Sequence, residues 1–188
     1  MVEAFIVSAG VIALAELGDK TQLLALVLAA RFRAPLPVIA GIATAVLANH
    51  LAAGAVGTLL ATFITPDLLR WLLVASFLGT AVWMLIPDRD PAAAERPSRY
   101  GAYLTTVFTF FLVEMGDKTQ IATVALAAKY HLLLAVVAGT TLGMLIADVP
   151  AVLLGRVAAD KLPIKLVHGI AAIVFVVLAV VALLRWSL

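Results

Sequence analysis

ELGDKTQ at residues 16–22 returns as EMGDKTQ at residues 114–120, shifted by 98 positions without a gap. From each glutamate onward, nine of sixteen consecutive positions are identical between the two copies. The register continues beyond them, since Gly41 falls on Gly139 under the same shift. One heptapeptide could arise by convergence, but a register kept over the following segments favours an internal duplication. The chain is therefore predicted to contain one structural unit twice.

The composition around the two motifs is that of a protein embedded in lipid. Of 188 residues, 64% are hydrophobic and only 13% are charged, whereas a soluble domain has roughly 45–50% apolar and about 25% charged residues. The core of a chain of this length could not bury the additional apolar residues, so many of them must lie on a surface that faces a bilayer. The formal net charge of +2 indicates basic loops at a membrane surface rather than nucleic-acid binding. The absence of cysteine excludes thiolate metal sites and thiol catalysis.

Six segments are apolar and long enough, at about 20 residues, to cross a bilayer as helices. They are residues 4–30, 36–62, 68–86, 102–128, 132–156 and 164–185. The predicted fold is an all-α membrane protein with a first three-helix repeat (1–86), a linker (87–101) and a second three-helix repeat (102–188). Because three is odd, the second repeat must enter the membrane from the opposite side. Such inverted-topology repeats are typical of transporters whose binding site lies near the midplane.

Lysine and arginine are distributed unequally between the two predicted sides of the membrane. Three lie on the side of the termini and eight on the side of the linker. Because basic loops favour the cytoplasm, we expect a cytoplasmic linker and both termini outside, in the cell (inner) membrane. No basic residue precedes the first apolar run, so this run is expected to be a mature span rather than a signal peptide.

Each motif places three charged residues inside an apolar run. Each charge would cost about 2.5–3.5 kcal/mol at the centre of a membrane helix, and packing alone does not justify that cost. On a continuous helix, Glu16, Asp19 and Lys20 fall on one stripe about 100° wide, and their counterparts in the second motif do the same. Both stripes are predicted to face the interior of the bundle and to meet there.

The oxygen-bearing side chains of the two motifs are predicted to form one metal site. The predicted ligands are Glu16, Asp19, Thr21, Gln22, Glu114, Asp117, Thr119 and Gln120, and the predicted supporting residues are Gly18, Lys20, Gly116 and Lys118. Hard oxygen ligands without histidine or cysteine suit Ca²⁺, Mn²⁺ or Mg²⁺ and match Zn²⁺ or copper poorly. The glycines fit close helix packing as well as a loosened helix whose carbonyls join the site.

A structural alternative exists for the charged residues. Glu16–Lys20 and Glu114–Lys118 have the i,i+4 spacing of ion pairs that only stabilise a helix. This interpretation leaves both aspartates unexplained.

Three further polar residues lie within predicted spans. Asn49 and His50 are neighbours in the second span, and His50 falls on Asp148 under the 98-residue shift. Polar residues at such positions could gate the site or relay protons. They could equally form hydrogen bonds between helices.

E-x-G-D-[KR]-[ST], present in two three-helix halves, resembles the motif of the cation/proton exchangers that include the eukaryotic Golgi manganese and calcium transporter and bacterial manganese exporters. The resemblance covers essentially the whole chain, and both copies of the motif are intact. It implies transport of a divalent cation, with Mn²⁺ export for a compact version such as this one and Ca²⁺ as the other candidate. The residues alone indicate only a hard divalent cation.

The leading hypothesis is a secondary transporter that exchanges a divalent cation for protons and needs no cofactor. A passive divalent-cation channel is the alternative, although channels more often build their pores by oligomeric symmetry than by an inverted repeat. The chain contains no H-E-x-x-H, no G-x-S-x-G and no nucleotide-binding loop. Neither an intramembrane enzyme nor an ATP-driven pump is therefore expected.

Overall fold

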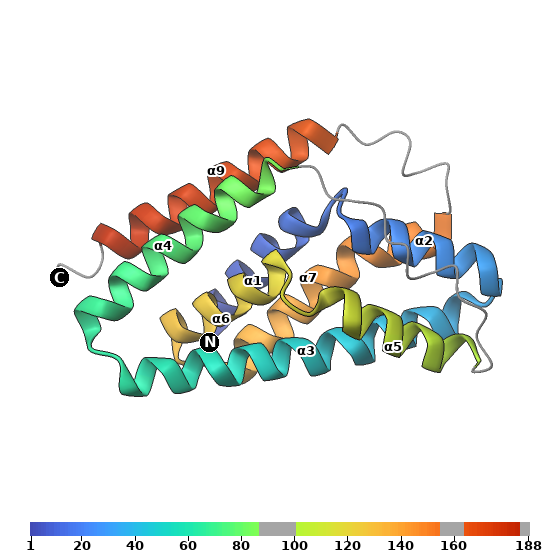
Figure 1. Ribbon diagram of the computed structural model, residues 1–188, viewed down its shortest axis with the longest axis horizontal. Helices are drawn as coiled ribbons and strands as arrows, with labels where there is room; N and C mark the ends of the chain where they lie inside the picture. Colours follow the sequence, from blue (N-terminus) through green and yellow to red (C-terminus); the bar gives the residue numbers. More distant parts are fainter. Residues whose placement is uncertain (87–100, 155–163, 185–188) are drawn as a thin grey trace.

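The computed structural model describes residues 1–86, 101–154 and 164–184, and every regular element in these ranges is an α-helix (Figure 1). The first half contains α1 (Val2–Glu16), α2 (Lys20–Phe32), α3 (Pro35–Phe63) and α4 (Pro66–Met84). The second half contains α5 (Ala102–Glu114), α6 (Lys118–Tyr130), α7 (Leu133–Leu154) and α9 (Ile164–Leu184). The all-α prediction is confirmed for the described residues. Nearly all of the predicted linker, residues 87–100, lies outside them.

The first and fourth predicted spans are each broken in the middle. Three non-helical residues, 17–19, separate α1 from α2, and residues 115–117 separate α5 from α6. Gly18 has a φ of 81° and Gly116 a φ of 76°, in the left-handed region that glycine adopts without a Cβ penalty. The prediction of one continuous helical stripe is therefore wrong, because the charged residues of each motif lie on both sides of a break. For the two glycines, the structure shows the loosened helix, whereas the participation of backbone carbonyls in the site stays a prediction.

Among the described residues, α3 and residues Leu133–Leu153 of α7 are both long enough and apolar enough to cross a membrane alone. The four helices beside the breaks have 13–15 residues and extend only about 20 Å each at 1.5 Å per residue. Only a pair joined across its break would match a hydrocarbon core about 30 Å thick. The six-span topology thus stays a prediction.

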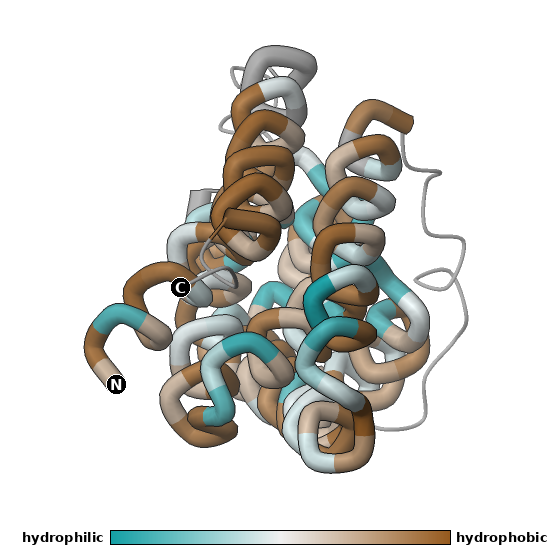
Figure 2. Tube along the Cα trace, turned by 90° about the vertical axis from the view of Figure 1, so that its left-hand side faces the viewer, coloured by the Kyte–Doolittle hydropathy of each residue, from teal (hydrophilic) through white to brown (hydrophobic). Residues whose placement is uncertain are grey.

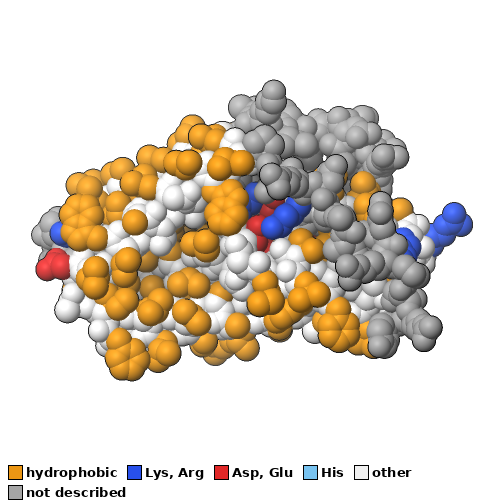
Figure 3. Space-filling model, in the orientation of Figure 1, with side chains coloured by type: hydrophobic (Ala, Val, Ile, Leu, Met, Phe, Trp, Pro, Cys, Tyr) orange, Lys and Arg blue, Asp and Glu red, His pale blue; other side chains and the backbone are white. Residues whose placement is uncertain are grey.

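Hydrophobic side chains cover much of the exterior. Phe63, Leu36 and Leu134 are each more than three-quarters exposed, and hydrophobic atoms spread over the face in Figure 3. The trace in Figure 2 is likewise hydrophobic along most of its helical length. An apolar exterior of this extent requires a covering, such as a membrane.

The two halves pack mainly against each other. α1 lies along α7, α3 lies along both α5 and α6, and α4 pairs with α9 (Figure 1). Among the described helices, the main contacts inside one half are those of α2 with α3 and of α6 with α7. The rings of Phe77 and Phe175, which are 98 positions apart, lie 6.3 Å from each other between α4 and α9. The core is therefore shared by the halves.

Matched glycines let helices of opposite halves touch. A Cβ added to Gly41 on α3 would lie 2.9 Å from the carbonyl oxygen of Tyr103 on α5. A Cβ on Gly139 of α7 would meet the carbonyl oxygen of Phe5 on α1, which is the repeat-related contact. Gly143 meets the α1 backbone one turn further along, so α1 and α7 run in the same direction. Small residues allow such close backbone contact between membrane helices.

Gly143→Ala is expected to destabilise the protein by about 1–3 kcal/mol, as overpacking does in a tight core. The new Cβ would meet the carbonyl oxygen of Ala9 and lie 3.0 Å from the nitrogen of Ala13, so α1 and α7 would have to separate. Thermal unfolding in detergent measures the effect. Gly79→Ala is the matched control, because nothing lies within 4 Å of a Cβ there. Equal melting temperatures of the two variants would contradict the close approach.

Candidate cation site

The four acidic residues of the motifs are buried at the two breaks. Glu16 and Glu114 are the last residues of α1 and α5, and Asp19 and Asp117 immediately precede α2 and α6. Each is at most 1% exposed. A buried carboxylate is costly unless it is neutralised, paired or bound to a cation. The contacts of these groups therefore indicate what the site can do.

Each aspartate is paired with the lysine of the opposite motif. Lys20 Nζ lies 2.5 Å from Asp117 Oδ1, and Lys118 Nζ lies 2.9 Å from Asp19 Oδ1. We call these two contacts the crossed ion pairs. Both oxygens of Glu16 lack a hydrogen-bond partner among the described residues, so the i,i+4 alternative is wrong for Glu16 and Lys20. The crossed ion pairs instead join the two halves at their breaks.

Asp148 on α7 lies near the two motif glutamates, Glu16 and Glu114. Of the two glutamates, Glu114 has a hydrogen-bond partner, because its Oε1 accepts a hydrogen bond of 2.5 Å from Thr119 Oγ1. Asp148, on α7, is fully buried, and neither of its oxygens has a hydrogen-bond partner among the described residues. The carboxylates of Glu16, Glu114 and Asp148 interact electrostatically with one another. Acidic side chains from α1, α5 and α7 therefore share one region.

The two glutamines hold the breaks in place. The N–H of Gly18 donates to Gln22 Oε1 at 3.0 Å, and the N–H of Gly116 donates to Gln120 Oε1 at 2.8 Å. Gln22 also donates through Nε2 to the carbonyl oxygen of Ala147, which ties α2 to α7. Both amide oxygens predicted as metal ligands thus accept hydrogen bonds from the backbone.

The remaining polar residues differ in their contacts. Asn49 Nδ2 donates to the carbonyl oxygen of Phe111 at 3.1 Å, as expected for a hydrogen bond between helices. His50 is fully buried, and neither ring nitrogen has a hydrogen-bond partner among the described residues. Thr21 is also fully buried, and its hydroxyl has no such partner in the described part of the chain. The hydrogen-bond interpretation is therefore confirmed for Asn49, whereas His50 and Asp148 form no such bond among the described residues.

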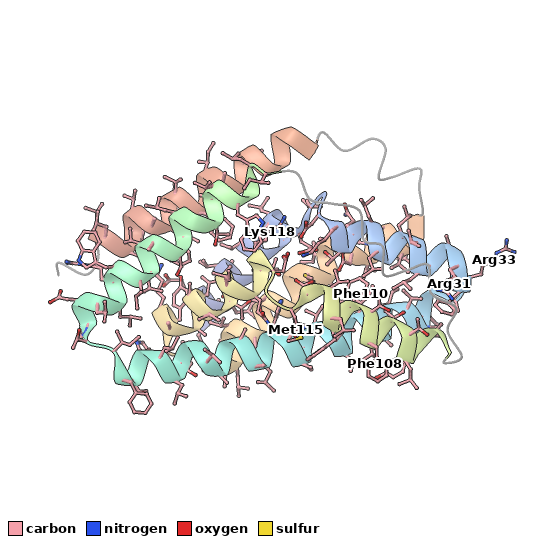
Figure 4. All side chains as sticks on the ribbon, in the orientation of Figure 1. Arg31, Arg33, Phe108, Phe110, Met115 and Lys118 are labelled. Carbon is pink, nitrogen blue, oxygen red and sulfur yellow. The ribbon has the colours of Figure 1, made fainter. Side chains whose placement is uncertain are left out.

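The crossed ion pairs differ in their access to the outside. The side chain of Lys20 is 23% exposed, whereas Lys118 and its partner Asp19 are fully buried. Figure 3 shows acidic and basic atoms at the bottom of a recess on this face, and Figure 4 places Lys118 in the same central region. The Lys20–Asp117 pair can thus be reached from one side, while the other pair is enclosed.

The carboxylates are close to one another but are not assembled around one point. Within the described residues, no three acidic or histidine side chains converge closely enough to hold a metal ion. The four motif carboxylates and the two lysines together carry a net charge of −2 when all are ionised. The site therefore has the charge and the oxygen ligands for a divalent cation, which would have to draw these ligands together.

Sequence reasoning found the buried charges through the repeat but missed their crossed pairing and the link from Asp148 to the glutamates. The 98-residue shift gave a partial signal for Asp148 by matching it with His50. No pattern in the sequence specifies which lysine reaches which aspartate.

Comparisons with known proteins agree with this chemistry. The model of the family described as "Divalent cation/proton antiporter GDT1" matches residues 4–92 and 102–187. The "Putative manganese exporter" of Vibrio cholerae serotype O1 is 49% identical over 174 residues, which cover 92% of this chain and 86% of that protein. A "GDT1-like protein" of Synechocystis is 30% identical over 203 aligned positions, which cover 97% of each. No solved structure matches the chain.

Proposed function

This chain belongs to the GDT1 family of divalent cation/proton antiporters, and from that membership we propose that it exports Mn²⁺ from the cytoplasm in exchange for protons. It is a membrane transporter and not an enzyme, as the family is. The observation that carries the proposal is the pair of buried E-x-G-D-K-T breaks, whose charged residues cross from one half to the other. Buried charge of this kind inside apolar helices is typical of ion pathways.

The proposed cation ligands come from both motifs. The carboxylates of Glu16, Asp19, Glu114 and Asp117 would supply the charge, with oxygens of Thr21, Thr119, Gln22 and Gln120 completing the shell. Such hard oxygen ligands favour Mn²⁺, Ca²⁺ or Mg²⁺. The name of the Vibrio relative points to manganese, and Ca²⁺ is the second candidate.

The proposed architecture has six spans in two inverted repeats. α1 with α2, and α5 with α6, would each form one discontinuous span with its break near the midplane. Broken helices at corresponding positions of two repeats mark the binding site in many secondary transporters. The repeat-related glycine contacts and the apolar exterior support this arrangement.

Uphill transport in proteoliposomes tests the proposal. An imposed pH gradient should drive Mn²⁺ against its own concentration gradient, because exchange couples the two ions. A passive channel can only dissipate a cation gradient. Parallel assays with Ca²⁺ and Mg²⁺ at the same pH gradient would give the order of preference. Downhill Mn²⁺ flux without any uphill component would favour the channel.

The predicted topology is tested by cysteine labelling. The chain contains no cysteine, so Ser98→Cys in the linker and Ser187→Cys at the C-terminus each introduce one reactive thiol. Both positions lie outside the described residues. In intact cells, a membrane-impermeant maleimide should label position 187, and position 98 should react only after the membrane is permeabilised. Labelling of both positions from the same side would refute the inverted six-span model.

A further inference from the structure

Two lysines lie at helix N-termini, where the helix dipole disfavours a positive charge. Lys20 and Lys118 are the first residues of α2 and α6, at the positive end of each helix dipole. A cation there costs typically 0.3–1 kcal/mol at the surface of a protein. Lys118 is in addition fully buried. Helix stability therefore does not account for either lysine, and their partners across the site must.

We infer that Lys20 and Lys118 are built-in counter-cations, which hold Asp117 and Asp19 while the substrate cation is absent and are displaced when it binds. This inference rests on the proposed function, since it concerns the same site. It assigns a positioning role to the lysines, because they act on the substrate through the aspartates.

The geometry of the crossed ion pairs favours such a displacement. Each ammonium group contacts Oδ1 of one aspartate, so a divalent cation bound to the same carboxylate at about 2.0–2.6 Å would lie close to a second positive charge and be repelled by it. Among the described residues, the carboxylates do not converge closely enough to hold a metal ion in the structure with both pairs closed. Opening of at least one pair would remove the repulsion and let the aspartates and glutamates surround a cation together.

The two pairs should open in a fixed order. The side chain of Lys20 is 23% exposed, so its ammonium can move toward solvent. Lys118 and Asp19 are enclosed on all sides. From the accessible side, the entering cation would therefore release Lys20 from Asp117 first. In the repeat-related conformation, open to the other side, Lys118 would take the place of Lys20.

Chemical labelling of lysine detects the displacement directly. Purified full-length protein in detergent is treated briefly with an amine-reactive acetylating reagent at one fixed pH, with and without Mn²⁺, and each lysine is quantified by mass spectrometry. Mn²⁺ should increase modification of Lys20 by about tenfold, since a coupling of 1.4 kcal/mol between contacting residues corresponds to that factor. Lys129 on α6, away from the breaks, is the control and should be unaffected.

The variant Asp117→Asn provides the matched comparison. Without its carboxylate partner, Lys20 should be highly reactive from the start, and Mn²⁺ should produce no further rise. Unchanged or reduced modification of Lys20 in wild-type protein with bound Mn²⁺ would overturn the inference.

Equilibrium binding of Mn²⁺ separates this inference from the proposed function. Lys20→Gln removes the ammonium group that competes with the cation. The variant should bind Mn²⁺ about tenfold more tightly than wild type, because loss of a competing interaction of 1.4 kcal/mol changes the dissociation constant by that factor. Equal or weaker binding by Lys20→Gln would contradict the counter-cation role while leaving the exporter proposal intact. Wild-type protein that binds no divalent cation would refute the proposed function, and this inference with it.

Discussion

Asp117→Asn and Asp19→Asn are each expected to abolish Mn²⁺ transport while the protein still folds in the membrane. Asparagine keeps the shape of the side chain but removes one negative charge and weakens an oxygen ligand. Even changes to residues that only hydrogen-bond a metal ligand cost about 10–100-fold in affinity or activity, so the loss of a ligand should lower the rate by at least about 100-fold. The measurement is the initial rate of Mn²⁺ uptake into inside-out vesicles.

The two variants should differ in stability. In Asp19→Asn, the fully buried Lys118 loses its ion pair with Asp19, whereas in Asp117→Asn the partly exposed Lys20 can reach solvent. Breaking an ion pair is more destabilising for a buried charge than for one that water can reach, so Asp117→Asn is the cleaner test of transport. Asp67→Asn serves as control, because Asp67 is 85% exposed and lies 3.9 Å from Arg70. Near-normal transport by both motif variants would mean that the crossed ion pairs are only structural.

Exchange of about two protons for one divalent cation is the second expected result, and it follows from charge. The four motif carboxylates and two lysines leave a net charge of −2 when the buried Asp148 carries a proton throughout, and one divalent cation or two protons would neutralise this charge. The empty, fully ionised site would be costly to enclose away from water. Only the cation-loaded and the doubly protonated states should therefore cross between the two access conformations.

Proteoliposomes with a pH-sensitive dye inside or outside measure this exchange. Mn²⁺ leaving the compartment equivalent to the cytoplasm should acidify that compartment, and the flux should follow an imposed pH gradient. Because the exchange moves no net charge, a potassium diffusion potential should change the rate little. Flux that follows voltage and ignores the pH gradient would contradict the exchange mechanism and support a channel.

The sequence predicted the helical class and the buried charges because both depend on composition and on a repeat that survives in the residues themselves. It left the breaks open as one of two interpretations of the glycines, since LGD and MGD inside an apolar run are equally compatible with a continuous helix. Glycine is tolerated within membrane helices, and only the left-handed backbone at Gly18 and Gly116 ends them. Side-chain pairing was also out of reach, because Lys20 meets Asp117 through the tertiary arrangement of two helices far apart in sequence.

The packing of α1 along α7 and of α3 along α5 also has a consequence for biosynthesis. While only the first half has been inserted into the membrane, α5 is not yet there to pack against Gly41 on α3, and α7 is not yet there to pack against α1. The first-half helices should therefore stay loosely associated in the bilayer until α5 and α7 are inserted. Truncation after the linker should leave a substrate for quality-control proteases instead of a folded half-transporter.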